Sequence, residues 1–379
     1  MFGKSIRLFK IFGFTVKIDL SWFIILALVA WSLAEGLFPL VYAGLPRSVL
    51  WLMGLAGALL LFASIVFHEL AHSLVERRYD LPIKGITLFV FGGVSEMEEE
   101  PSSARAEFMM AVAGPLSSMG LGFALYGLAV LGVSVGVPPP VIGVTAYVAV
   151  MNLVLAIFNL LPGFPLDGGR ILRSILWFWK GDLRWATRIA AGVGKGFGLA
   201  FIAFGVINVA LGSLVAGIWW TLIGLFLRSA AERSYRQLVV RQALAGEPVR
   251  RFMNERPVKV APWATVETLV KDYAYKHHQR MFPVAENGNL FGCIDLGQVK
   301  TLPLGEWGRH AVLEYTQPCT PENSIAPEDD ATEALARMGR SHTGRLLVVE
   351  DSKLVGVIAL RDVMQFLSLK MELGDTKQE

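Results

Sequence analysis

Long apolar stretches, separated by short polar connections, occupy the first 235 residues of this chain. Six of them reach or approach the ~20 residues that a helix needs to cross a bilayer. The predicted spans are residues 20–39, 50–76, 106–134, 140–160, 188–212 and 213–231. Hydrophobic residues make up 54% of the chain and charged residues only 18%, which is typical of a helical membrane protein. The pattern therefore predicts a polytopic membrane domain made of helices.

The basic residues between the spans predict an orientation. They gather before the first span and in every second connection, at residues 4–17, 77–105, 170–188 and 228–241. The alternate connections hold only Arg47 or, as in Val135–Pro140, no charge at all. Because Lys and Arg are enriched in cytoplasmic loops, we expect a multi-pass protein of the cell membrane with both termini in the cytoplasm. No small-residue cleavage site follows the first apolar stretch, so we expect it to be retained.

An internal repeat appears after about residue 245, where the charge density rises. The segment Phe282–Gly292 matches Leu346–Gly356, and each copy reads as a strand, a polar turn and a second strand followed by a helix. This doublet resembles a pair of CBS domains, which are cytosolic modules that often sense adenine nucleotides. Cys293 and Cys319 both lie here, without a disulfide framework, which favours a reducing compartment. The predicted divisions are a membrane domain at 1–235, a linker at 236–249, a CBS pair at 250–370 and a tail at 371–379.

The strongest chemical signal is His68-Glu69-Leu70-Ala71-His72, which ends an uncharged apolar run. On a helix the two histidines project from one face, so both imidazoles can bind one Zn²⁺. Glu69 is then placed to act as the general base of a hydrolase. Alternatively, these are ordinary helix residues near the membrane interface. That reading is disfavoured because ionisable groups near a bilayer are costly without a function.

A catalytic zinc needs a third protein ligand, and the membrane part contains no third histidine. The best candidate is Asp167, in the segment Asn159–Arg170 (NLLPGFPLDGGR). Its prolines interrupt a helix and its glycines permit tight backbone, and irregular backbone at membrane depth is tolerated only inside protein or beside a wet cavity. The alternative is that Asp167 caps the helix that follows it.

The two motifs, in this order, resemble those of the site-2 protease family of intramembrane zinc metalloproteases. The resemblance implies that His68, His72 and Asp167 bind one zinc ion and that Glu69 is the catalytic base. It also implies that Asn159 helps to hold the substrate backbone or the developing oxyanion. An interhelical hydrogen bond is the other reading of Asn159.

Two further segments extend this resemblance. Residues 84–97 alternate like a strand around Gly92 and Gly93, and an exposed edge there could bind an unwound substrate by strand addition. A small structural hairpin is the alternative. Ala113–Leu116 resembles a family element in which small residues allow close helix packing.

The predicted CBS pair keeps only part of the usual nucleotide signature. Asp362 stands where an acidic residue can accept ribose hydroxyls, but Leu360 replaces the usual hydroxyl residue and Gln298 replaces the acid in the first copy. Binding of an adenine nucleotide and a purely structural or homodimer-forming role therefore both remain open.

These observations together predict an all-α membrane protein with six transmembrane helices and a small membrane-associated β-sheet, joined to a cytosolic α/β CBS pair. The expected activity is zinc-dependent hydrolysis of a peptide bond in or near the transmembrane segment of a membrane-tethered regulator, within the lipid bilayer. The resemblance suggests anti-sigma or pro-sigma factors as such regulators. A net charge of +3 without a basic block gives no sign of direct nucleic-acid binding. The alternative is a metal-ion transporter gated by CBS domains, against which the membrane part offers no onward path of acidic or histidine residues.

Overall fold

The computed structural model describes residues 6–79, 83–89, 92–97, 101–341 and 344–374. The chain divides into two compact units, Met1–Arg236 and Gln237–Glu379.

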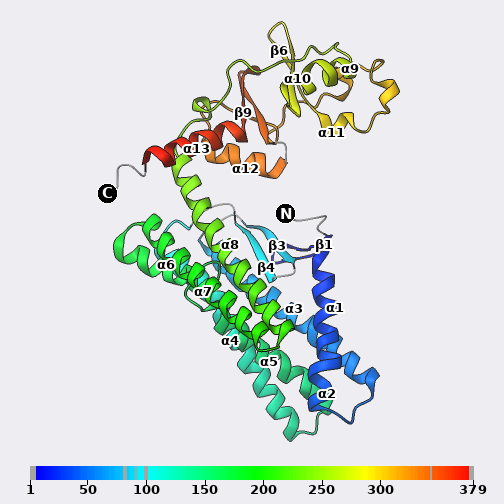
Figure 1. The fold of residues 1–379 in the computed structure, drawn as a ribbon, viewed down its shortest axis with the longest axis vertical. Coiled ribbons are helices and arrows are strands. Elements are labelled where there is room, and N and C mark those ends of the chain that lie inside the picture. The colour runs from blue at the N-terminus through cyan, green and yellow to red at the C-terminus, as the bar shows by residue number, and fades with distance from the viewer. Residues whose placement is uncertain (1–5, 80–82, 90–91, 98–100, 342–343, 375–379) are drawn as a thin grey trace. The chain divides into compact units, whose positions relative to one another are not determined.

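Among the described residues, six helices are long and apolar enough to cross a membrane (Figure 1). All six begin in the first unit, and the last of them continues into the second. They are Ser21–Val41 (α1, Ser21–Ser32; a π-helical turn, Leu33–Leu37; α2, Phe38–Val41), α3 (Arg47–Arg78), α4 (Ala104–Ser134), α5 (Pro139–Asn159), α7 (Leu183–Ala210) and α8 (Leu214–Leu244). The six predicted spans are confirmed. Helix α8 is longer than expected, because it continues through residues 236–244 of the predicted linker. A shorter helix, α6 (Asp167–Lys180), follows α5.

The helices of this unit bury small residues and expose large apolar ones. The buried face of α4 carries Ala106, Ala111, Gly114 and Gly122, whereas many large side chains of the bundle, such as Phe123, are exposed. A Cβ added at Gly122 would lie 2.8 Å from a methyl group of α5, so the two backbones approach closely. Close helix packing through small residues, with large apolar side chains outward, suits a solvent of lipid tails.

A four-stranded sheet accompanies the helices. Its order is β1 (Ile6–Ile11), β2 (Phe14–Ile18), β3 (Ile83–Phe89) and β4 (Gly92–Met97), with β2 and β3 parallel and the outer pairs antiparallel. The strand structure predicted within residues 84–97 is confirmed, since β3 and β4 cover most of them and pair antiparallel. The two N-terminal strands were not predicted, although Phe14–Ile18 alternates apolar and polar residues and buries the apolar ones. Strands β3 and β4 contact α3, the helix that carries both histidines of the motif.

The second unit confirms the internal repeat down to its hydrogen-bond register. Phe282 pairs with Ile294 in one hairpin and Leu346 with Ile358 in the other, and each hairpin has a bulge at the same step. Each hairpin has its own apolar core, and a third cluster joins the two hairpins. The strands are β5 (Met281–Glu286), β6 (Asn289–Asp295), β7 (Ser324–Ile325), β8 (Arg345–Glu350) and β9 (Lys353–Ala359). The helices are α9 (Val266–Thr268), continued by a π-helical segment (Leu269–Ala274) and α10 (Tyr275–His277), then α11 (Leu296–Val299), α12 (Ala331–Ser341), α13 (Leu360–Gly374) and 3-10 turns at Val249–Arg251, Leu304–Glu306 and Val312–Tyr315.

Candidate metal centre

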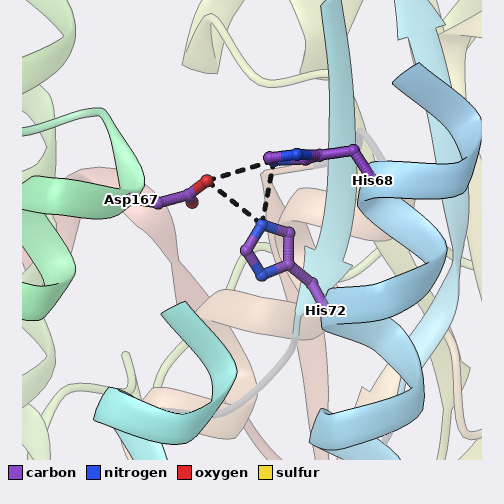
Figure 2. A group of neighbouring side chains, drawn as sticks. All are labelled: His68, His72 and Asp167. Carbon is purple, nitrogen blue, oxygen red and sulfur yellow. Dashed lines mark hydrogen bonds and ion pairs between the residues drawn. The ribbon is translucent and has the colours of Figure 1, made fainter. Parts of the chain in front are cut away.

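Three side chains from two distant parts of the chain converge on one point (Figure 2). His68 and His72 lie on α3, and Asp167 is the first residue of α6. The two Nε2 atoms are 3.2 Å apart, and Oδ2 of Asp167 lies 3.1 Å and 3.2 Å from them. Both histidines are buried, and the Asp167 side chain is only 15% exposed. The triangle of potential ligand atoms is therefore almost equilateral.

The dimensions of this triangle fit a zinc ion. Four ligands placed tetrahedrally at about 2.0–2.1 Å from zinc are about 3.3 Å from one another. The observed edges of 3.1–3.2 Å are close to that value. In addition, Nδ1 of His72 lies 2.7 Å from the Met110 carbonyl oxygen, which can only accept a hydrogen bond. In a neutral ring this nitrogen donates, so Nε2 presents its lone pair to the centre of the triangle.

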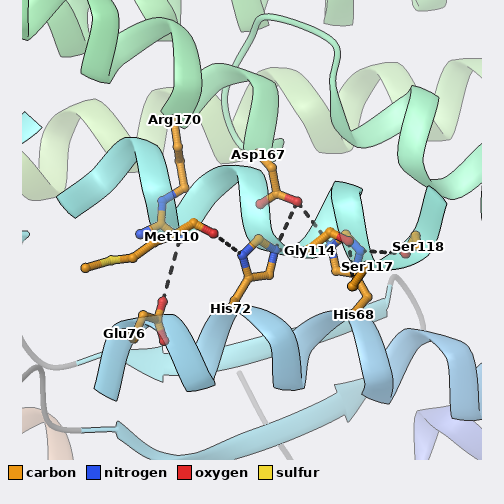
Figure 3. A network of polar contacts seen from close by, with 9 residues as sticks. All are labelled: His68, His72, Glu76, Met110, Gly114, Ser117, Ser118, Asp167 and Arg170. Atoms are coloured by element: carbon orange, nitrogen blue, oxygen red, sulfur yellow. Dashed lines mark hydrogen bonds and ion pairs between the residues drawn. The ribbon is translucent and has the colours of Figure 1, made fainter. Parts of the chain in front are cut away.

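Helix α4 packs against both imidazole rings (Figure 3). The carbonyl of Met110 meets one ring, and Oγ of Ser118 lies 2.9 Å from Nδ1 of His68. Gly114 lies between them: a Cβ added there would be 2.2 Å from Nε2 of His72 and 2.6 Å from Nε2 of His68. The small residue predicted to allow close helix packing thus makes room for the two imidazoles. Sequence reasoning missed Met110 and Ser118, although their four-residue spacing about Gly114 was a usable signal.

Asp167 faces the histidines and does not cap its helix. The cap position of α6 is Leu166, and no side chain makes a capping hydrogen bond there. The alternative reading of Asp167 as a helix cap is therefore wrong. The prediction that Gly168 and Gly169 permit close backbone contact is confirmed, but the backbone that they approach is that of the loop before α6. A Cβ at Gly168 would lie 2.3 Å from the Leu160 carbonyl oxygen.

Two buried ion pairs attach α6 to the helices around the cluster. Arg173 donates from Nε to Glu107 Oε1 of α4 at 2.5 Å, and a second guanidinium nitrogen contacts the same oxygen. Arg170 lies 3.9 Å from Glu76 of α3, one helical turn beyond His72. Because breaking a buried ion pair is strongly destabilising, these contacts hold the helix that begins with the aspartate. Sequence reasoning missed both acidic partners, and four-residue spacing from the histidine was the available signal for Glu76.

Comparison with known proteins places the chain in a family. The profile of Peptidase family M50 matches residues 56–141 and 137–203, and the profile of the CBS domain matches residues 315–369. Zinc metalloprotease MJ0392 of Methanocaldococcus jannaschii is 33% identical over 383 residues, covering 98% of this chain and 99% of that protein. This chain belongs to peptidase family M50. It is a zinc metalloprotease, and the predicted family, fold class and enzyme class are confirmed.

Other similar proteins cover most of the same residues. Rip3 of Mycobacterium tuberculosis is 35% identical over 367 residues, which cover 96% of this M50 chain and 93% of Rip3. The solved site-2 protease from Methanocaldococcus jannaschii is 32% identical and covers 61% of this chain and 94% of that one, with a TM-score of 0.42. Membership of a zinc metalloprotease family implies zinc, and six apolar helices make this M50 protein a multi-pass membrane protein.

The other predicted site residues lie outside the three-residue cluster. Glu69 is half-buried on α3, directly after the first histidine. Asn159 is the half-buried last residue of α5, just before the loop that leads to α6. Gly92 and Gly93 pair with β3 from β4, at the edge of the sheet. Asp362 is exposed in the first turn of α13. Among the described residues, the structure thus brings together only the three potential metal ligands.

Proposed function

We propose that this M50 protein is an intramembrane endopeptidase, which hydrolyses a peptide bond in or near the transmembrane segment of a membrane-tethered regulator. The observation that carries the proposal is the convergence of His68, His72 and Asp167, with edges that suit one zinc ion, next to Glu69 on a membrane helix. In this proposal the three residues are the zinc ligands, one ion binds per chain, and residues 1–235 are the protease domain.

Zinc and the residues around it would have different roles in peptide-bond hydrolysis. Bound zinc supplies Lewis-acid activation of a water molecule and of the scissile carbonyl group. Glu69 accepts a proton from the attacking water and then returns it to the leaving amide nitrogen. The Met110 carbonyl holds the His72 ring in the tautomer that ligation requires. The ion pair of Glu107 and Arg173 keeps the third ligand in place.

The substrate would bind as an unwound segment. Strand β4 is an edge of the sheet and lies against α3, so it can add a further strand from another protein. Gly92 and Gly93 would contact the substrate backbone there. Asn159, at the end of α5, would donate to the substrate backbone or to the oxyanion that forms during hydrolysis.

The second unit would be the regulatory part. We place both termini in the cytoplasm, as the basic connections predict, and residues 250–370 in the cytosol as a CBS pair after a linker at 236–249, with a tail at 371–379. The register-matched hairpins support two related modules. In this proposal the pair binds an adenine nucleotide near Asp362, forms a homodimer and regulates cleavage.

The deciding experiment is Glu69→Gln in full-length protein reconstituted with a transmembrane substrate. We expect one zinc per chain to be retained and cleavage to be lost. Glu35→Gln is the matched control, because this exposed carboxylate on another membrane segment accepts only the Trp51 indole. Unchanged cleavage by Glu69→Gln would refute the role of the base. Metal flux into liposomes without cleavage would instead support the CBS-gated transporter.

A further inference from the structure

Helices α7 and α8 are antiparallel and touch along a seam of glycines. A Cβ added at Gly198 would lie 2.8 Å from the Gly224 carbonyl oxygen, and one added at Gly205 would lie 2.6 Å from that of Gly217. The seam does not reach the start of α7. There the two helices line a cavity of about 480 Å³, here called the α7–α8 pocket, whose lining includes Arg188, Gly192, Lys195 and Tyr235.

Two cations of this pocket share one face of α7. Arg188 and Lys195 are seven residues, or about two helical turns, apart. Gly192 lies between them, and a Cβ there would meet no atom within 4 Å, so the space is open. The structure records no hydrogen bond or ion pair for either cation among the residues it describes. Glu232 of α8 interacts electrostatically with Lys195, but its carboxylate is bonded to Arg236 at 2.6 Å.

The depth of Lys195 calls for an anionic partner. From Lys195 to the end of α7 at Ala210 the helix is about 22 Å long, which is less than the ~30 Å hydrocarbon layer. With Ala210 placed at the far boundary of the hydrocarbon layer, the backbone of Lys195 lies within the apolar layer, and its ammonium group must reach the headgroup level or meet a counter-ion. Exposed apolar side chains flank it on the same helix: Ile189, which also lines the pocket, and Leu199.

We propose that the α7–α8 pocket binds an anionic glycerophospholipid. Arg188 and Lys195 pair with the phosphodiester, and the Tyr235 hydroxyl donates a hydrogen bond to it. The acyl chains extend from there toward the bilayer centre, along the exposed Leu199 of α7. Basic pockets between transmembrane helices bind lipid headgroups in this way, on the side where anionic lipids are abundant. The site is separate from the metal centre and does not depend on peptide hydrolysis.

The test compares spin-labelled phosphatidylglycerol with spin-labelled phosphatidylcholine on full-length protein in mixed vesicles. We expect wild-type protein to hold the anionic lipid about thirtyfold more tightly, the effect of two basic groups near the surface. The double variant Arg188→Gln/Lys195→Gln should lose this preference. The matched control Arg184→Gln/Arg233→Gln removes two exposed arginines of the same helices that do not line the pocket, and it should keep the preference.

Further measurements make the outcome decisive. Zinc content and helical circular dichroism of each variant show whether the protein is folded. Lys195→Gln alone should weaken the preference, whereas Lys195→Arg, which keeps the positive charge, should retain it. Inorganic phosphate and glycerol 3-phosphate are added as competitors. Displacement of the lipid by either one at millimolar concentration would assign the pocket to a free phosphate compound and overturn the proposal. An unchanged lipid preference in the folded double variant would overturn it as well.

Discussion

Replacing Gly114 by alanine perturbs the proposed zinc site without removing a ligand. The added Cβ would lie 2.2 Å from Nε2 of His72 and 2.6 Å from Nε2 of His68. Non-bonded carbon atoms prefer separations of about 3.5–4.0 Å, so the overlap is about 1 Å with each ring. Both imidazoles must therefore move away from the point at which the three potential ligands converge.

The expected loss of zinc affinity follows from that displacement. Ligand distances in metal sites are maintained within about 0.2 Å, so a shift of about 1 Å exceeds the tolerance of the site. Substituting a residue that only supports a ligand typically lowers metal affinity about 10–100-fold. Because both histidines are displaced here, we expect Gly114→Ala to weaken zinc binding at least ~100-fold, which corresponds to about 2.7 kcal/mol.

Competition with a chromophoric chelator in detergent measures this affinity directly. Gly120→Ala is the matched control, because it lies on the same helix and its Cβ would meet no atom within 4 Å. The control should bind zinc like the wild type, and both variants should keep their helical circular dichroism. Wild-type zinc affinity in Gly114→Ala would refute the packing of α4 against the two histidines.

Three other predictions test the surroundings of the site and the second unit. Ser118→Ala removes the hydrogen bond to the His68 ring, a proposed zinc ligand, and should weaken zinc binding about 10–100-fold. Ser117→Ala, whose hydroxyl donates to the Gly114 carbonyl of its own helix, should not; equal chelator titrations would contradict this. Glu107→Gln leaves Arg173 buried without its carboxylate and should lower the free energy of unfolding by about 3–5 kcal/mol, while replacing both residues by Met should restore most of it in thermal unfolding. Burial raises the pKa of Asp330, but hydrogen bonds from two backbone amides and a hydroxyl outweigh it, so the net pKa is lowered. The Asp330 carboxylate therefore contributes its full stabilisation above its unfolded pKa of about 3.9 and loses it as pH falls through the folded value. Asp330→Asn should flatten this loss of stability in acid, measured by hydrogen exchange of residues 237–374. An unaltered pH profile in the variant would contradict the prediction.

Local patterns were enough to predict several elements of this protein. Apolar length alone identified the six membrane helices, because a span needs a nearly uniform run of side chains that lipid can solvate. The four-residue spacing of His68 and His72 predicted a shared helix face. The repeat predicted two hairpins, and their pairing of Phe282 with Ile294 and Leu346 with Ile358 follows the same offset.

Other features depended on contacts between residues far apart in the chain. The N-terminal strands β1 and β2 belong to the sheet because β2 pairs in parallel with β3, which lies about 70 positions later in the chain. Residues 14–18 do alternate apolar and polar side chains, but five residues of local pattern do not show which distant strand they pair with. The buried partners of α6, Glu76 and Glu107, were hidden for a similar reason, since nothing in a local window tells which arginine will face them.

The sequence by itself determined that two histidines and a glutamate lie on one membrane helix and that Asp167 follows in a broken segment. Only the tertiary structure decided that this aspartate meets both rings and that Gly114 leaves the space in which they lie. Helical periodicity sets which side chains share a face over a few turns. Which face of one helix meets which face of another is set by packing between segments 99 residues apart, and the cluster that α3 and α6 form against α4 depends on that packing.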